Sequence, residues 1–325
     1  MKRTIAILGS LVLLSASLWA MPSVAADPIR SDLNLGRADA ALQKLNTVLA
    51  QNPADAEALN LRCRVYYQEE LWDQALSDCQ AAVQANPSSS AYHLWLGRAY
   101  GQKASHASLM SAYKLARKVA AEFQKAVQLD PRNASALADL GEFDVSAPSM
   151  VGGGIARAQK LLPQLEAIDA AAALNLQAKI AESQKNYPAA ESSLRVAIAH
   201  SSDPSAAWMD LAGFYRRRGQ MAQMVAAVHN GVSLDRHHGT ALVDGAENLT
   251  EAHLDPQTAI HWLQQYLASA GQSEEAPAFA VRAKLAHLLA DQGDSWGAQQ
   301  QLAAAHAVAS GYRVPARGFS SVASR

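Results

Sequence analysis

Cysteine, aromatic residues and charge are all scarce in this sequence of 325 residues. Two cysteines are too few for a small secreted fold held together by several disulfides. Charged residues make up 18% of the chain and the formal net charge is −1, so we expect no basic face and no nucleic-acid partner. Aromatic residues contribute 6%, but hydrophobic residues of all kinds reach 50%, which excludes an intrinsically disordered chain.

Residues 1–26 have the pattern of a secretory signal peptide. A short basic start precedes an uncharged apolar run at 5–19, and small residues follow at 24–26. The run is shorter than the ~20 residues that a membrane-spanning helix needs, so a retained membrane anchor is the weaker alternative. We expect cleavage after Ala26, or alternatively after Ala25, and no stable membrane insertion after cleavage.

The sequence also indicates a compartment. No cysteine follows the apolar run, so a lipid anchor is not expected there. The rest of the chain lacks the multi-cysteine modules of many extracellular proteins. We therefore expect a periplasmic or secreted bacterial protein.

After the signal, the chain shows an internal period close to 34 residues. Asn-Pro pairs at 52–53 and 86–87 lie 34 residues apart, and Asp-Pro at 130–131 repeats the same turn. A small residue followed four positions later by a bulky one recurs through the chain. These pairs are Ala41/Leu45, Ala75/Cys79, Val119/Phe123, Ala158/Leu162, Ala190/Leu194, Met224/Val228, Ala259/Leu263 and Ala298/Leu302.

A second motif follows each turn and places bulky residues on one helical face. Its best copy is Trp208-x-x-Leu211-Ala212-x-x-Tyr215, with the four residues at i, i+3, i+4 and i+7. Together the two motifs resemble the tetratricopeptide repeat, a helix–turn–helix unit of about 34 residues. The resemblance covers nearly all of the chain after the signal. It implies an all-α fold, a right-handed α-solenoid of stacked helical hairpins.

We expect a single solenoid over 27–311, because one hairpin has too little core to fold without its neighbours. A half repeat at 32–52, with one helix over 32–50, caps the stack, and its partner helix would fall in the signal. Residues 312–325 are expected to form a flexible tail. The expected full units are 56–87, 90–131, 134–169, 171–203, 205–236, 239–272 and 279–310.

Two insertions interrupt the period. Ten extra residues between 101 and 119 predict a lengthened helix or an extra turn that projects beyond the regular unit. The second insertion contains Gly152, Gly153 and Gly154, ahead of a helix expected to start near Ile155. We favour a loop that needs positive φ, which glycine adopts at little steric cost, over an anion-binding turn.

The two cysteines occupy inward positions in one unit, Cys63 on its first helix and Cys79 on its second. An oxidising compartment permits a disulfide between antiparallel helices. Their offset, however, is about one helical turn too great for an ideal facing pair. A disulfide and two buried thiols that pack as small apolar residues are therefore the two alternatives.

No signature of the common hydrolases is present: HExxH, GxSxG and SxxK are all missing. The adjacent His237 and His238 point to different sides of the chain and have no third ligand at metal spacing. We expect no catalytic residue, metal or cofactor. The insertions do offer polar side chains without a recognisable constellation, namely Lys103, His106, Lys114 and Glu142.

The resemblance also implies that the first helix of each unit lines a concave groove that binds a protein or peptide. The expected groove residues are Asn60, Arg64, Tyr67, Arg98, Asn175, Lys179, Arg216 and Arg217. Arg64 and Arg98 would make the N-terminal half of the groove mildly basic, and Glu247 and Glu251 would make its C-terminal part acidic. We expect a non-catalytic periplasmic scaffold. The alternatives are a structural subunit of an envelope assembly and a cell-wall-modifying enzyme with its site at the insertions.

Overall fold

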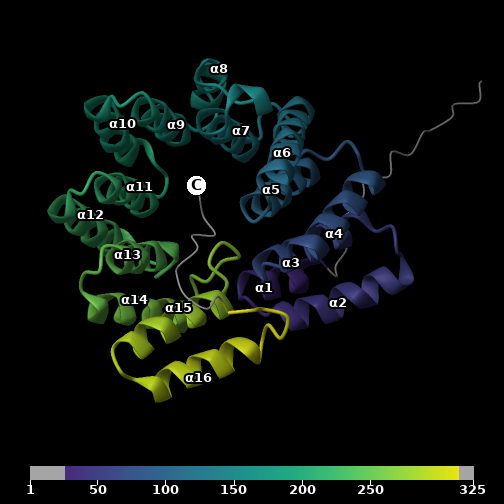
Figure 1. Cartoon of the computed structure of the whole chain (residues 1–325). Coiled ribbons are helices and arrows are strands. Elements are labelled where there is room, and N and C mark those ends of the chain that lie inside the picture. Colours follow the sequence, from purple (N-terminus) through teal and green to yellow (C-terminus); the bar gives the residue numbers. More distant parts are fainter. Residues whose placement is uncertain (1–25, 315–325) are drawn as a thin grey trace, which may run out of the picture.

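The computed structural model describes residues 26–314, and this part of the chain contains sixteen α-helices, one short 3₁₀ helix and no strand. The prediction of an all-α solenoid is confirmed (Figure 1). The helices are α1 (Ala26–Asn34), α2 (Ala38–Gln51), α3 (Ala56–Gln68), α4 (Trp72–Ala85), α5 (Ser90–Ser105), α6 (Leu109–Leu129), α7 (Ala134–Ser146), η1 (Ser149–Val151), α8 (Ile155–Glu166), α9 (Ala170–Ser183), α10 (Tyr187–His200), α11 (Pro204–Arg217), α12 (Met221–Leu234), α13 (Thr240–Glu251), α14 (Pro256–Ala268), α15 (Ala278–Asp291) and α16 (Ser295–His306).

From α3 onward, consecutive helices pair into hairpins, and each hairpin lies, to within one residue, inside the bounds of a unit expected from the sequence. The first helix of five successive hairpins starts at a polar residue whose side chain accepts a hydrogen bond from a backbone N–H in the first turn, which satisfies a group that the helix itself leaves unpaired. These caps are Asp55, Ser89, Asn133, Asp169 and Asp203.

The alternation of small and bulky residues builds the core between helices. All of the paired side chains in the repeated motif are buried except Leu162 and Leu302, which are half-buried. Gly97 shows why small residues are needed on the first helix: a Cβ atom there would lie 2.5 Å from the ring of Phe123 on α6. The two helices of this hairpin can therefore approach closely only because position 97 has no side chain.

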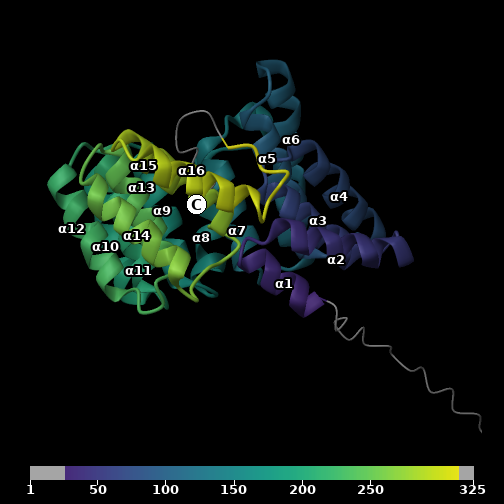
Figure 2. The same cartoon turned by 90° about the horizontal axis from the view of Figure 1, so that it is seen from below.

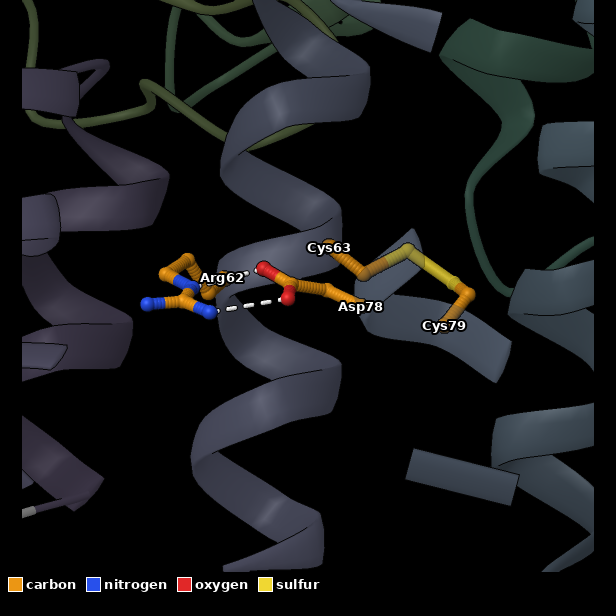
Figure 3. Close-up of a disulfide and its surroundings, with 4 residues drawn as sticks. All are labelled: Arg62, Cys63, Asp78 and Cys79. Atoms are coloured by element: carbon orange, nitrogen blue, oxygen red, sulfur yellow. Dashed lines mark hydrogen bonds and ion pairs between the residues drawn. A yellow bond between two sulfur atoms is a disulfide. The ribbon is translucent and has the colours of Figure 1, made fainter. Parts of the chain in front are cut away.

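A disulfide crosslinks the first full hairpin (Figure 3). Cys63 of α3 and Cys79 of α4 are both fully buried, and their Cα atoms lie 5.3 Å apart, within the range of a disulfide. Next to it, Arg62 donates two hydrogen bonds to the carboxylate of Asp78, at 2.6 and 2.8 Å. Of the two alternatives for the cysteines, the structure shows the disulfide.

The N-terminal half repeat differs from the sequence-based expectation. The prediction of one helix over 32–50 is wrong, because the chain turns between α1 and α2, where Gly36 has φ +62°. The partner helix expected to be lost with the signal is instead α1, whose Ile29 and Leu33 are buried. The export signal itself lies outside the described residues, apart from Ala26, which begins α1.

The solenoid returns to its own start. Ile29 and Leu33 of α1 share a buried cluster with Phe279 of α15 and with Ala305 and Ala309 at the end of the last hairpin. Figure 1 shows the segment after α16 beside α1 and the start of α2, so that the last hairpin meets the first helices, and Figure 2 shows the same array from below. The two ends of the array therefore cover each other's apolar surface.

The contact between the two ends of the array also moves the C-terminal boundary of the solenoid beyond the expected residue 311. Tyr312, assigned to the tail from the sequence, packs its ring 4.8 Å from that of Phe279. The rest of the expected tail, after Val314, lies outside the described residues. Between residues 26 and 314, no helix is both long and apolar enough to cross a bilayer.

The first insertion lengthens both helices of its hairpin. α5 has 16 residues and α6 has 21, and Figure 2 shows the end of this hairpin projecting beyond its neighbours. This is one of the two outcomes that the ten extra residues predict.

The second insertion forms η1 and a tight glycine loop before α8. Gly152 and Gly154 have φ of +103° and +144°, and a Cβ atom on Gly153 would lie 2.1 Å from the carbonyl oxygen of Ala147. The three glycine N–H groups donate to carbonyls at positions 149, 148 and 144. This geometry supports the structural interpretation, because these N–H groups are occupied within the loop and do not present an anion-binding turn.

Candidate functional site

Two adjoining hollows line the inner face of the solenoid, and we call them together the concave site. The first, of about 560 Å³, is walled mainly by α7, α9, α11 and α13, and the second, of about 420 Å³, extends towards α5. Both are lined by Glu142, Asn175, Lys179, Ala206 and Asp210. The first helices of successive hairpins therefore form one continuous surface.

Five of the expected groove residues line this surface: Arg98, Asn175, Lys179, Arg216 and Arg217. They come from three different first helices, α5, α9 and α11. The helical period brings them together, because the same face of each first helix turns inward.

The other three expected groove residues line neither hollow. Asn60 is buried, with 3% of its surface exposed. Arg64 pairs with Glu274 in the loop before α15, where the end of the array meets its start. Tyr67 packs edge-on against Trp72 and Trp95, each at 5.5 Å between ring centroids, and burial raises its pKa. These three do not lie in the open groove, because Asn60 is buried, Arg64 belongs to the closing contact and Tyr67 to the aromatic packing.

A ladder of polar contacts links neighbouring first helices across the concave site. Lys179 of α9 pairs with Glu142 of α7 at 2.6 Å, and Arg217 of α11 pairs with Glu182 of α9 at 2.8 Å. The hydrogen bond to Glu182 raises the pKa of Arg217. Arg216 continues the ladder to Glu251 of α13. Each contact joins residues about one repeat apart, so the ladder holds the inner wall in register.

The concave site has more acidic than basic residues. The first hollow is lined by six carboxylates and three basic side chains, and the second by six carboxylates and two basic side chains. The carboxylates of the first are Glu142, Glu182, Asp210, Asp244, Glu247 and Glu251; those of the second are Asp139, Glu142, Asp169, Asp203, Asp210 and Glu275. A positively charged ligand therefore fits the site electrostatically better than a negatively charged one.

The expectation of a mildly basic N-terminal half is therefore wrong. Arg98 donates to the carboxylate of Asp139 at 2.6 Å, and Arg64 pairs with Glu274. Both arginines also lie over the ring of Trp95, 4.9 Å from its centroid. Asp139 and Glu274, which offset these charges, are not among the residues that the repeat pattern places in the groove. The acidic C-terminal part expected from Glu247 and Glu251 agrees with the structure, because both residues line the first hollow.

Sequence reasoning missed Asp210 among the residues that line both hollows. Helical spacing could have identified it, because Asp210 lies four positions after Ala206 and seven before Arg217, on the same helical face. Asn248 was also missed; its side-chain oxygen accepts a hydrogen bond from Arg216 at 3.0 Å.

Three of the four polar side chains noted at the insertions are used in structural contacts. Lys103 pairs with Asp73 at 2.8 Å, and His106 stacks on Trp72 with 5.7 Å between ring centroids. Glu142 belongs to the ladder described above. In the part of the chain that the structure describes, no group of three or more His, Cys, Asp or Glu residues is placed to hold a metal ion.

Comparison with known proteins gives one family. Residues 29–90, from α1 to the start of α5, match the model of the tetratricopeptide repeat. No curated protein matches the sequence at a significant level.

Solved structures with a similar arrangement are bacterial tetratricopeptide repeat proteins. One from Thermus thermophilus is 21% identical, with 58% of this chain and 98% of that chain covered and a TM-score of 0.49. One from Parabacteroides merdae is 12% identical, with 76% and 92% covered and a TM-score of 0.49. The C-terminal part of one from Cytophaga hutchinsonii is 14% identical, with 75% and 94% covered and a TM-score of 0.41.

The family match and the repeated hairpin agree with each other. The match spans α2, α3 and α4, and the same pairing of a first helix with a second helix that carries the small-then-bulky motif continues to α16. The chain therefore carries the sequence signature of the tetratricopeptide repeat at residues 29–90, and helical hairpins follow one another from there to α16.

Proposed function

We propose that this protein is an exported, non-catalytic scaffold that holds a positively charged peptide segment of a partner protein in the concave site. The excess of carboxylates over basic side chains in both hollows is the observation that carries the proposal. Repeat solenoids commonly bind extended segments on such concave surfaces, and this supports a peptide as the ligand.

The wall of the site is suited to binding without a large rearrangement. Contacts such as Lys179 with Glu142 and Arg217 with Glu182 hold neighbouring first helices to each other. A preformed surface loses little conformational entropy when a ligand binds. Carboxylates along the wall would attract Lys and Arg side chains during encounter, and this attraction weakens as salt screens it.

Export is part of the proposal and rests on two features. The first is the basic start, apolar run and small residues at 1–26. The second is the disulfide between Cys63 and Cys79, since such bonds persist mainly in oxidising compartments. Cell fractionation combined with intact mass tests this: a periplasmic chain that starts at Asp27 or Ala26 supports export, and a cytoplasmic chain with its N-terminus intact contradicts it.

Fluorescence anisotropy with labelled peptides tests the ligand. The panel contains peptides of equal length rich in Lys and Arg, rich in Asp and Glu, or composed of Gly and Ser. The variant E142Q/D210N removes two carboxylates that line both hollows. The control E166Q/D291N removes two exposed carboxylates at the ends of α8 and α15, outside both hollows.

We expect the basic peptide to bind most tightly and its affinity to fall as salt rises. E142Q/D210N should weaken it by about tenfold, while E166Q/D291N leaves it unchanged. Absence of binding by every peptide would contradict the proposal of a peptide scaffold. Tighter binding of the acidic peptide would support a peptide scaffold but would refute a positively charged ligand.

A further inference from the structure

The lengthened hairpin of α5 and α6 ends in a group of exposed apolar side chains, which we call the hairpin tip. Leu109 and Met110 start α6 with 90% and 69% of their surfaces exposed. Tyr113 follows on the same helical face and is 37% exposed. Its hydroxyl donates to the backbone carbonyl of Met150, whose side chain is 70% exposed. The first insertion, with Leu109 and Met110, and the second, with Met150, thus both contribute exposed apolar side chains to the hairpin tip.

The hairpin tip is also basic. Lys114, Arg117 and Lys118 are exposed and lie within two and a half turns of Leu109. The sequence contains no Asp or Glu between Asp78 and Glu122. Among the described residues, Lys114 and Arg117 form no ion pair. The basic side chains of the concave site, such as Arg98, do pair with carboxylates that offset their charge.

The position of the hairpin tip favours a flat, deformable surface over a fitted protein pocket. Figure 2 shows this end of the hairpin projecting beyond the neighbouring helices, so that it can meet a surface without hindrance from the rest of the solenoid. Apolar side chains flanked by Lys and Arg are the composition of segments that lie in the headgroup region of a bilayer. The aliphatic stems of Lys and Arg can cover apolar surface while their charges stay at the headgroups.

We propose that the hairpin tip docks the protein onto an anionic lipid bilayer. Leu109, Met110 and Met150 enter the boundary between headgroups and acyl chains, and Lys114, Arg117 and Lys118 contact the lipid phosphates. The contact is peripheral, which agrees with the absence of a membrane-spanning helix between residues 26 and 314. It is independent of the concave site, which no residue of the hairpin tip lines.

Vesicle co-sedimentation of the purified full chain tests this docking. One set of vesicles contains phosphatidylglycerol and phosphatidylcholine in equal parts, and the other contains phosphatidylcholine alone. The variants are L109S/M110S/M150S for the apolar contact and K114Q/R117Q/K118Q for the charges.

Two controls match these changes elsewhere on the molecule. W296S removes a side chain that is 71% exposed on α16. R132Q/K185Q/R236Q removes three exposed charges from loops or helix ends away from the hairpin tip. Circular dichroism verifies that every variant keeps its helical content.

We expect binding to the anionic vesicles and little binding to the neutral ones. K114Q/R117Q/K118Q should lower the partition coefficient by about 100-fold, since each basic residue near an anionic surface contributes about fivefold. L109S/M110S/M150S should lower it by at least about tenfold, and the controls should leave it within about twofold.

Three results would overturn the proposal. These are absence of binding to anionic vesicles, equal binding to both kinds of vesicle, and equal losses in the tip variants and their controls. A dimer that forms without vesicles and is broken by L109S/M110S/M150S would also overturn it, because the hairpin tip would then be covered by a second copy.

Discussion

The carboxylate of Asp39 on α2 accepts hydrogen bonds from both the backbone N–H and the hydroxyl of Ser310, a residue 271 positions away. The backbone N–H of Asp39 in turn donates to the carbonyl of Val308 at 3.0 Å. These contacts join the segment after α16 to the first helices. They make the array a closed unit, in which the two ends of the chain's helical part are joined by hydrogen bonds.

Substitution of Asp39 tests this closure. D39A should lower the free energy of unfolding by about 1–2 kcal/mol, because it removes hydrogen bonds to a charged acceptor. Hydrogen exchange should increase in 305–314 and in α1 and remain unchanged in α9 to α12. D291A, at an exposed acid that ends α15, is the control and should change neither quantity. Uniform loss of protection throughout the chain would argue against a local closing contact.

The disulfide should stabilise the first full hairpin measurably. Reduction of Cys63–Cys79, which are 16 positions apart, should lower the free energy of unfolding by about 3 kcal/mol, because the unfolded chain gains freedom. Thermal unfolding with and without reductant measures the effect. The double variant C63A/C79A serves as the control, since its melting temperature should not respond to reductant. An identical melting temperature for the oxidised and reduced wild type would contradict the expectation.

Two glycines of α5 give a matched pair for helix packing. G97A should destabilise the protein by about 1–3 kcal/mol, because the new Cβ would lie 2.5 Å from the buried Phe123 ring. G101A has no atom within 4 Å of its new Cβ and should stabilise by about 0.5–1 kcal/mol. Denaturant unfolding of both variants measures the difference. Similar effects of the two substitutions would contradict the close approach of α5 and α6.

Stability should fall as the pH rises towards neutrality, because of Glu69 at the closing contact. Its side chain lies against Gly311, and burial together with the nearby Asp39 raises its pKa from 4.5 to about 7. A carboxyl group that stays protonated to a higher pH in the folded state than in the unfolded state stabilises the fold below pH 4.5. That contribution is lost as the pH rises to about 7.

The variant E69Q isolates this effect. It should be more stable than the wild type by about 1–2 kcal/mol at pH 8, because no charge is buried without a partner. Its stability should also change less between pH 5 and pH 8 than that of the wild type. Thermal unfolding over this range measures both, and parallel pH profiles of the two proteins would show that another group is responsible.

The sequence predicts the parts of this molecule that repeat. The period of about 34 residues, the two helices of each unit and the inward position of Cys63 follow from local spacing, and each appears in the structure. Arg98 and Arg217 also lie on the inner face, because helical periodicity alone places them there.

Contacts between distant units could not be predicted in the same way. The partners Asp39 and Ser310, or Arg64 and Glu274, share no motif and come together only through the summed curvature of the whole array. The acidic character of the concave site follows only in part from the sequence. Helical spacing places Glu247 and Glu251 on the inner face, whereas Asp139, which pairs with Arg98 from the neighbouring unit, is not among the residues that the spacing selects.

Photo-crosslinking tests most directly whether the concave site binds a partner. A peptide rich in Lys and Arg that carries a benzophenone group is irradiated with the full chain, and mass spectrometry maps the modified residues. We expect crosslinks on the inward residues of α7, α9, α11 and α13, and their loss in E142Q/D210N. Crosslinks confined to the outer helices α8, α10, α12 and α14, or unchanged by that variant, would contradict this expectation.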